Sequence, residues 1–416
     1  MTLNPAGRTI ETVSLATLHT DAVRRNPYAF YAELHARGPV CAVTPGESRY
    51  TFIVHGYEAV SQLLRSPDIR VSDRTRLDFV PTWAEHRTEA VFMNSMFFSN
   101  EPRHSRMRRM FGQTFTPRRI TNLDPAVVSI AEGLLDRIEA TVKSGERVDF
   151  MREYAFPLPA NVLGELLGVP EEDREWYRPR ADALGRLLEL GGATQHNVEV
   201  ANTASVEITD YFAELAAKRR EEPRDDLISA LVQASDADSG QLSPEELIAN
   251  LVVVFNAGFV TTTHLLGNGL SMLLERPELL ARLRADYSLM PSYVEEILRY
   301  DVPTHFSVRQ AVNDVEIGGT LIPAGSWVLV LLAAANRDPG HFPDPDTFDP
   351  TRPNTSTLAF GGGPHYCMGA ALARMEGQRG LQALFERFDE ISIAEPPATP
   401  RQLMLRGYDE LWLNLS

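Results

Sequence analysis

A mainly α-helical chain with a minor β region, an α+β fold class, is predicted by three observations. From about residue 100 to residue 300, nearly every segment carries apolar residues at helical spacing, interrupted by Gly and Pro. After residue 303 the pattern changes to short apolar runs separated by glycine turns, which is typical of strands. The 416 residues are 44% apolar and 23% charged and contain no internal repeat, a composition that indicates a folded globular protein.

The first expected elements lie before residue 60. Residues 1–20 are expected to form a flexible N-terminal arm, and residues 21–416 a single domain. A helix is predicted to begin near Pro27, because the apolar residues that follow share one helical face until Gly38-Pro39 ends it. Residues 40–55 alternate in polarity and predict a short hairpin.

A long central helix is the clearest element of the sequence. Ser243-Pro244-Glu245-Glu246 is a capping box with Pro at the first helical position, and the helix could continue to Glu275. Phe306–Ile317 and Trp327–Leu332 are predicted strands. A final helix is expected after Gly369, and short strands are expected at the C-terminal end.

The charge balance argues against nucleic-acid and membrane partners. The chain has 56 acidic and 40 basic residues and a net charge of −16, so its average field repels phosphate. Its longest apolar stretches, 247–254 and 327–335, are shorter than the ~20 residues that span a bilayer. The two cysteines, Cys41 and Cys367, form no spaced disulfide framework, which indicates a reducing compartment. We therefore expect a soluble cytoplasmic protein.

The most informative segment is the loop Phe360–Gly369, with three consecutive glycines before Cys367. Such a loop lets the main chain approach a bulky flat group closely. Cys367 precedes the final helix, where unpaired N–H groups and the helix dipole favour a thiolate that can bind a soft metal or haem iron. An inert cysteine beside a flexible loop is the alternative, and it is the interpretation that we prefer for Cys41.

This loop resembles the haem-ligand signature F-G-x-G-x-H-x-C-x-G of the cytochrome P-450 family and matches it at every fixed position. Glu296-Ile297-Leu298-Arg299 is similar to the family's E-x-x-R, and Phe348–Arg352 resembles its downstream arginine segment. Residues 257–262 resemble the oxygen-activating stretch of its central helix. The resemblance covers about residues 25 to 413. It implies haem b held between the central helix and the Cys-loop helix, with Cys367 as axial ligand.

The same resemblance implies further cofactor contacts and a structural network. Haem propionates need cationic or hydrogen-bonding partners. The positions that contact them in relatives are His104, Arg108, Arg309 and His365. A buried network of Glu296, Arg299 and Arg352 is also implied. Taken singly, each of the four propionate candidates is more often a solvated basic side chain, but together with the cysteine loop the four favour a haem contact.

For the reaction, the resemblance implies a monooxygenase that inserts one atom of O₂ into an organic substrate. Thr261 fits the position of the threonine that organises proton delivery, and a local helix distortion is plausible at residues 261–263; the alternative is a run that bonds its own backbone carbonyls. Relatives usually carry an acid where this chain has Val260. Asn256 could relay protons instead, the substrate could supply a polar group, or catalysis could be altered.

Substrate-facing positions come from the resemblance alone. An apolar lining with two polar exceptions suits a medium-sized, partly polar molecule. The candidates are Phe79, Trp83, Phe92, Phe98, Val253, Asn256, Phe259, His305, Phe306, Met404 and Leu405.

A local basic patch contrasts with the acidic chain. Arg103, Arg106 and Arg109, with residues 118–119 nearby, could dock an acidic electron donor such as a ferredoxin, which is itself reduced by a reductase. A solvated basic face is the alternative. The protein is expected to be a monomer whose substrate is either free or tethered to a carrier protein.

The function expected from these features is the tailoring of a bacterial secondary metabolite, with a catabolic hydroxylase as the alternative. A haem-binding recruiting protein with little turnover is a second alternative, for which Val260 is the only sign. A cysteine hydrolase is disfavoured, since Cys367 and His365 are two residues apart and do not readily form a nucleophile–base pair.

Overall fold

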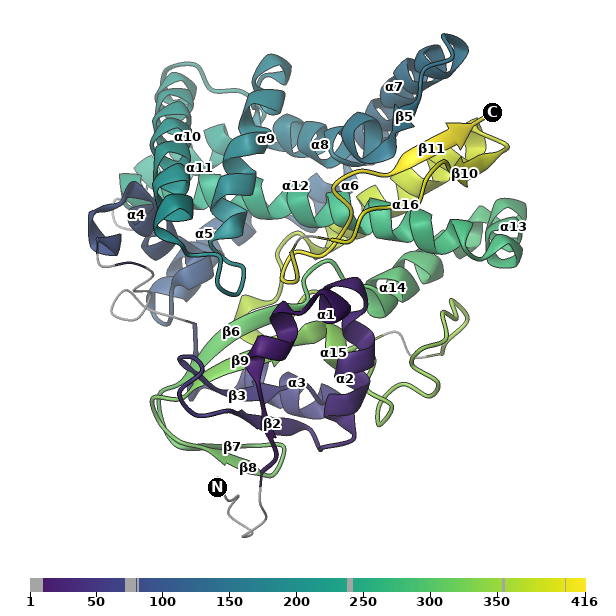
Figure 1. The fold of residues 1–416 in the computed structure, drawn as a ribbon. Coiled ribbons are helices and arrows are strands. Elements are labelled where there is room, and N and C mark those ends of the chain that lie inside the picture. Colours follow the sequence, from purple (N-terminus) through teal and green to yellow (C-terminus); the bar gives the residue numbers. More distant parts are fainter. Residues whose placement is uncertain (1–9, 72–79, 81, 238–241, 354–355, 401) are drawn as a thin grey trace. The chain divides into compact units, whose positions relative to one another are not determined.

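The computed structural model describes residues 10–71, 80, 82–237, 242–353, 356–400 and 402–416 (Figure 1). The chain forms two compact units, each assembled from segments that are distant in the sequence. We call residues 1–72, 288–367 and 398–409 the β-rich unit, and residues 73–287, 368–397 and 410–416 the helical unit. Because the chain passes from one unit to the other and back, neither is a separate sequence domain.

The β-rich unit contains a six-stranded mixed sheet with strand order β1-β2-β3-β9-β6-β4, and β7 pairs with β8 as a separate hairpin. Its strands are β1 (Thr12–Val13), β2 (Val40–Val43), β3 (Tyr50–Val54), β4 (Ile69–Arg70), β6 (Phe306–Ala311), β7 (Val315–Ile317), β8 (Thr320–Ile322) and β9 (Trp327–Leu331). Its helices are η1 (Leu15–His19), α1 (Asp21–Arg25), α2 (Pro27–His35), α3 (Tyr57–Arg65), α14 (Met290–Tyr300), α15 (Leu332–Ala335) and η6 (Gly363–His365), with η5 (Tyr287–Leu289) at the unit boundary.

The predicted hairpin is confirmed, and strands are also found where they were predicted after residue 303. Val40 pairs with Val54 in antiparallel register, which closes residues 40–54 as a hairpin. β6 and β9 also pair antiparallel, with Val308 opposite Leu329. The long predicted strand over residues 306–317 is divided in two, since residues 312–314 form a bend between β6 and β7.

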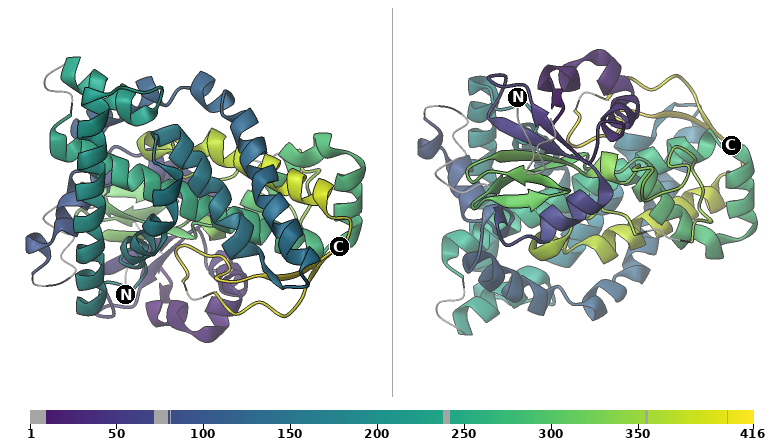
Figure 2. Two further views of the ribbon diagram at one scale, coloured as in Figure 1. Left: turned by 90° about the horizontal axis from the view of Figure 1, so that it is seen from above. Right: turned by 90° about the horizontal axis from the view of Figure 1, so that it is seen from below.

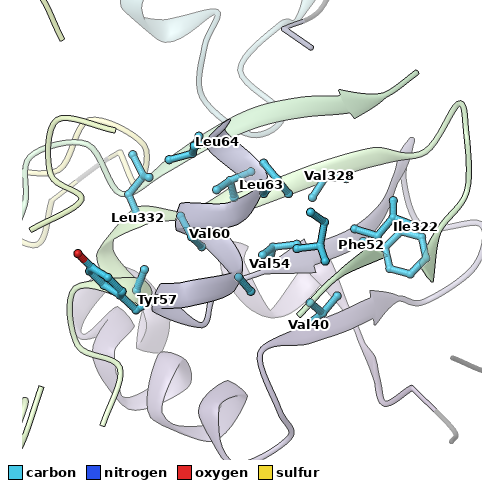
Figure 3. Close-up of a cluster of buried hydrophobic side chains, with 14 of the residues drawn as sticks. Val40, Phe52, Val54, Tyr57, Val60, Leu63, Leu64, Ile322, Val328 and Leu332 are labelled. Carbon is cyan, nitrogen blue, oxygen red and sulfur yellow. The ribbon is translucent and has the colours of Figure 1, made fainter. Parts of the chain in front are cut away.

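Helix α3 supplies one side of the core of the β-rich unit (Figure 3). Its apolar residues Val60, Leu63 and Leu64 are buried together with Val54 and Val328 of the sheet. Each aliphatic side chain removed from water in this way contributes roughly 1.5–3 kcal/mol to burial free energy. This core supports the Cys367 loop, because the loop rests on the C-terminal end of α3.

Residues 10–20 do not form the flexible arm that the sequence predicts. Thr12 and Val13 pair with β2 in parallel register. Leu15 and Leu18 of η1 are buried, and their exposed fractions are 6% and 2%. The prediction of an arm over residues 1–20 is therefore wrong from residue 10 onward, and residues 1–9 lie outside the described residues.

The helical unit carries most of the helices and one small sheet of order β10-β11-β5. Its elements in chain order are η2 (Trp83–Glu85), α4 (Arg87–Met93), η3 (Met96–Phe98), α5 (Arg103–Thr114), α6 (Pro117–Thr121), α7 (Asp124–Lys143), β5 (Val148–Asp149), the π-helix η4 (Met151–Ala155), α8 (Pro157–Leu167), α9 (Glu171–Arg186), α10 (Gln195–Glu221), α11 (Leu227–Ala237), α12 (Pro244–Leu274), α13 (Pro277–Ala285), α16 (Ala370–Arg387), β10 (Ile391–Ile393) and β11 (Trp412–Leu415).

The central helix α12 passes through the middle of the helical unit (Figure 1). The predicted capping box is present: the Ser243 hydroxyl accepts from the Glu246 backbone N–H at 3.2 Å, and the Glu246 carboxylate accepts from the Ser243 N–H at 3.0 Å. Among the described residues, α12 alone is long and apolar enough to cross a membrane. Half of its apolar window is buried inside the protein, as in the core helix of a soluble protein, so this is weak evidence for a span.

Helix α16 packs against α12 and also lies along α7 (Figure 2). A Cβ atom at Gly380 would come within 2.7 Å of Leu158 Cδ2 and 3.0 Å of Leu266 Cδ2, so glycine allows this close approach. The Arg379 guanidinium pairs with Asp124 of α7 at 2.6 Å. These contacts fix α16 inside the helical unit.

Candidate functional site

The Cys367 loop is held by its own backbone and by α3. The Cys367 N–H donates to the Phe360 carbonyl at 3.0 Å, and the Tyr366 N–H donates to the Gly363 carbonyl at 3.1 Å. Gly363 has a φ of +65°, and a Cβ atom there would lie 2.1 Å from the backbone oxygen of Leu64. Only glycine fits this position, since a side chain would be strained by the backbone angle and would also collide with α3.

The two cysteines occupy opposite environments. The Cys41 thiol is buried in β2, and burial raises its pKa to about 11, so it stays neutral and unreactive. Cys367 is exposed, two residues before the N-cap Gly369 of α16. An accessible thiol on a glycine-built loop fits the ligand role that the sequence predicts, because a thiolate donates to iron only if the iron can reach it.

The Arg309 side chain of β6 hydrogen-bonds to neutral groups of its own strand. Its guanidinium donates to the Ser307 hydroxyl at 2.5 Å and to the Val308 carbonyl at 2.8 Å, and it forms no ion pair within the described part of the chain. Burial lowers the pKa of Arg309 to about 10. A propionate would supply the missing anion, so Arg309 fits a haem contact. His365, half-buried in η6, lies in the same unit.

The three residues of the predicted E-x-x-R network lie together in the β-rich unit. Glu296 and Arg299 of α14 are completely buried and form a two-pronged ion pair with both distances at 2.7 Å. Arg352 also donates to Glu296 at 3.2 Å. Arg299 in addition donates to the carbonyls of residues 336, 345 and 347. The network therefore ties the irregular segment before the Cys367 loop to α14.

A single stripe of α12 is incompletely covered. Val253, Asn256, Val260 and Thr261 recur at helical spacing and are half-buried, although most of the helix is buried. These side chains belong to the stretch that resembles the oxygen-activating region. The stripe offers three polar side chains, those of Asn256, Thr261 and His264.

The prediction of a local helix distortion at residues 261–263 is wrong, because α12 continues unbroken from Pro244 to Leu274. The hydroxyls of Thr261, Thr262 and Thr263 each donate to the carbonyl four residues earlier, at 3.0, 3.1 and 2.9 Å. The alternative that the sequence left open, a run bonded to its own backbone, describes this segment.

Glu376 is a functional candidate that the sequence analysis missed. Its side chain is fully buried in α16, next to the Thr262 hydroxyl of α12, and its Oε1 atom has no hydrogen-bond partner among the described residues. Burial raises the pKa of Glu376 well above its usual value, which favours the protonated, neutral form of the carboxyl. One signal was present in the sequence: Leu372, Glu376 and Gly380 recur every four residues, which places an acid on the buried stripe.

Helix α5 presents His104 and Arg108 from one side. His104 is 2% exposed, with Nδ1 3.5 Å from the Glu101 carboxylate, and Arg108 is half-buried. Burial lowers the pKa of His104, although hydrogen bonding to Glu101 opposes this. A neutral buried imidazole and a nearby cation suit a contact with a propionate.

The basic patch is smaller than predicted. Arg103 and Arg106 are both bound to the carboxylate of Glu246, each at 2.7 Å, so they are not free to meet an acidic partner. Arg119 is paired with Asp225 at 3.1 Å. Arg109 is exposed, as is Arg118. These two are the members of the patch that remain available for docking.

Many of the predicted substrate contacts are explained by packing within their own unit. Phe259 is 1% exposed and contacts the rings of Phe156, Tyr177 and Phe255. His305 is completely buried, and its Nδ1 lies 3.0 Å from the Tyr31 hydroxyl. Four other candidates are also buried: Trp83, Phe92, Phe306 and Met404.

The remaining substrate candidates are better placed to meet a ligand. Val253, Asn256, Phe98 and Leu405 are half-buried. Phe98 stacks on Phe92 with ring centroids 4.9 Å apart. Phe79 lies outside the described residues.

Known proteins similar to this chain were found by sequence and by structure. A family model described as Cytochrome P450 matches residues 7–175 and 188–406. The cytochrome P450 monooxygenase PikC of Streptomyces venezuelae is 39% identical over 373 residues, which cover 89% of this chain and 86% of that protein. The 6-deoxyerythronolide B hydroxylase of Saccharopolyspora erythraea is 38% identical over 411 residues, which cover 96% of this chain and 98% of that protein.

A similar solved structure is that of P450BioI in complex with an acyl carrier protein that carries hexadec-9Z-enoic acid. It has a TM-score of 0.86 and 32% sequence identity, and the match covers 95% of this chain and 99% of that chain.

Proposed function

Because this chain belongs to the cytochrome P450 family and is a monooxygenase, we propose that it hydroxylates or epoxidises a medium-sized bacterial secondary metabolite. Two relatives support this choice of substrate class: PikC and the 6-deoxyerythronolide B hydroxylase. The observation that carries the proposal is the accessible Cys367 thiol on its glycine loop. We place the protein in the cytoplasm as a monomer.

The residues described above fit haem b. The Cys367 thiolate would bind the haem iron, and Arg309, His365, His104 and Arg108 would bind the propionates. When bound, the haem supplies a site for O₂ and accepts the electrons of the reaction, with the thiolate favouring cleavage of the O–O bond. Within the protein, the glycine loop holds the sulfur in place, and Arg309 meets a charge that it otherwise lacks.

Val260 raises the question of how protons are supplied, because its side chain cannot transfer a proton and relatives usually carry an acid at this position. We propose that Glu376 compensates for the missing acid, because it is a buried neutral carboxyl beside the threonine run of α12. Asn256 can accept and donate hydrogen bonds but does not release a proton at neutral pH. The alternative of a haem-binding recruiting protein without turnover is disfavoured, since Thr261, Cys367 and this internal acid are all present.

The electrons come from a separate donor, which we propose to be a ferredoxin with its reductase. The substrate is either free or bound to a carrier protein, as in the P450BioI complex. A catabolic hydroxylase remains the alternative function.

An absorbance titration tests the proposal. The haem-replete protein should show a Soret band that shifts towards the high-spin form with one class of compound. Cys367→Ser should abolish the thiolate spectrum, whereas the matched variant Cys41→Ser should keep it. No Soret band in the wild type would contradict the haem assignment, and a normal spectrum that no free compound shifts would favour a carrier-bound substrate. Labelled O₂ should place one labelled atom in the product.

A further inference from the structure

Glu246 joins the start of α12 to one flank of α5. Glu246 is 4% exposed, and its carboxylate accepts four hydrogen bonds. These come from Arg103 Nε at 2.7 Å, from the two terminal nitrogens of Arg106 at 2.9 and 2.7 Å, and from the Ser243 N–H at 3.0 Å. A surface ion pair contributes little, but a buried carboxylate with this number of donors fixes the geometry of both helices.

The charge of Glu246 is maintained despite burial. Burial by itself raises the pKa of Glu246, but hydrogen bonds from Arg106, the Ser243 backbone and Arg103 outweigh it and hold the pKa at about 2. The carboxylate is therefore ionised at neutral pH, and the ion pairs to Arg103 and Arg106 (the Glu246 clamp) do not depend on a change of its protonation there.

Further contacts of two residues, Arg103 and Asn250, reinforce the same junction. Arg103 also donates to the Met93 carbonyl and to Asn94 Oδ1, both at 2.8 Å, which ties the end of α4 to the clamp. One turn after Glu246, Asn250 accepts from the Met96 N–H at 2.8 Å, and its amide lies 3.3 Å from Met107 Sδ of α5. α5 is therefore held against α12 by charge and by buried polar contacts.

The two flanks of α5 have different partners. At about 100° per residue, Arg103 and Arg106 point to one side of the helix. His104 and Arg108 point to the other side, about 150° away. The buried residue Met107 lies between the two flanks. Rotation of α5 about its axis would therefore move both flanks together.

We propose that Glu246 is a positioning residue that fixes the rotation of α5 and thereby the direction in which His104 and Arg108 meet the haem. The inference rests on the proposed haem contact of these two residues. Glu246 itself touches neither substrate nor cofactor in this role. Its partners Arg103 and Arg106 thus act within the fold and not as a docking patch.

The test compares Glu246→Gln with Glu245→Gln, which makes the same charge change in the same helical turn. Glu246→Gln should speed haem transfer to a haem-scavenging apoprotein by about tenfold and shift the midpoint potential of the haem. Interaction free energies between residues of one hydrogen-bond network produce effects of this size. Glu245→Gln should stay within about twofold of the wild type. In an Arg108→Gln background the effect of Glu246→Gln should shrink, since both act through the same flank.

Other outcomes would overturn the proposal or separate it from the haem assignment. If Glu246→Gln lowers only the unfolding midpoint and leaves haem release unchanged, Glu246 is merely a helix cap. An undiminished effect in the Arg108→Gln background would also overturn the proposal. If Glu246→Gln fails to fold, the variant Arg106→Gln is used in its place, because Glu246 then retains its ion pair with Arg103. A wild type that takes up no haem would contradict the proposed function instead. In that case, hydrogen exchange of the α5 amides in Glu246→Gln would test whether Glu246 holds α5 in place. Unchanged protection of these amides would overturn the proposal.

Discussion

Glu376 of α16 lies beside Thr262 of α12 in the interior of the helical unit, with one carboxyl oxygen that no described residue bonds. A carboxyl in this setting is more stable with its proton than without it. We predict an infrared C=O band from a protonated carboxyl in the wild type at neutral pH. The band should be missing in Glu376→Gln and present in Glu386→Gln, which alters an exposed acid of the same helix. A wild-type spectrum without that band would contradict the assignment.

The raised pKa of Glu376 also sets a pH dependence of stability. Between pH 4.5 and the folded-state pKa, the folded chain keeps a proton that the unfolded chain loses. The stabilisation is therefore complete below about pH 4.5 and is lost as the pH rises through the folded-state pKa. Glu376→Gln should remove this loss, so that its free energy of unfolding falls less than that of the wild type from pH 6 to pH 9. Urea unfolding across this range measures the difference.

A third prediction concerns Val260. If Glu376 supplies protons, then Val260→Glu should change the peroxide released per turnover by less than about twofold, whereas a positioned acid contributes ~10²-fold or more. Glu376→Gln should raise peroxide release, and Val260→Glu in that background should lower it again. A large fall in peroxide for Val260→Glu alone would mean that the acid at this position is what the enzyme lacks. Glu386→Gln serves again as the control.

Two buried histidines predict acid sensitivity of the β-rich unit. Burial lowers the pKa of His305 to about 4 and that of His55 to about 3. The unfolded chain therefore binds more protons below pH 6.5, and the free energy of unfolding should fall by about 1.4 kcal/mol per pH unit for each histidine as the pH decreases. Urea unfolding at pH 7, 6 and 5 measures this slope. His305→Gln should make it shallower, and replacement of the exposed His196 should leave it unchanged.

Local signals in the sequence were sufficient for much of the fold. The start of α12 follows from Ser243 and Glu246 because a capping box involves neighbouring residues only. The hairpin of β2 and β3 follows from alternation and a short turn. In contrast, the pairing of Thr12 with β2 joins segments about 30 residues apart, and the sequence around Thr12 contains no sign of its partner.

The candidate site likewise contains features that follow from short motifs and features that depend on partners distant in the sequence. The resemblance located Cys367 and the E-x-x-R network, since these positions belong to compact motifs. The two arginines of the predicted patch could not be assigned correctly, because their partner Glu246 lies 140 or more residues away. Glu376 was missed because an acid on an apolar helix stripe gives no indication of what covers it.

The reduced basic patch predicts a sharper test of donor docking. Arg109 is exposed and outside the Glu246 clamp, so Arg109→Gln should slow electron transfer from a ferredoxin at low salt, with an effect that diminishes as salt screens the charges. Arg147→Gln removes an exposed charge that pairs with Glu395 near the end of α7 and should leave the rate unchanged. Stopped-flow reduction at two salt concentrations measures both variants. Equal rates for Arg109→Gln and the wild type at low salt would remove this residue from the docking surface.

The last prediction concerns the glycine that seats the Cys367 loop on α3. Gly363 and Gly319 both have positive φ angles, +65° and +74°, but only Gly363 would bring a Cβ atom against backbone, that of Leu64. Alanine at either position should cost about 1–3 kcal/mol of backbone strain. Gly363→Ala should in addition displace the loop and weaken haem retention, because Cys367 is carried on that loop. Gly319→Ala, in the β7–β8 turn, should lower stability and leave the Soret band unchanged. Equal haem retention in the two variants would show that the contact with Leu64 does not position the thiolate.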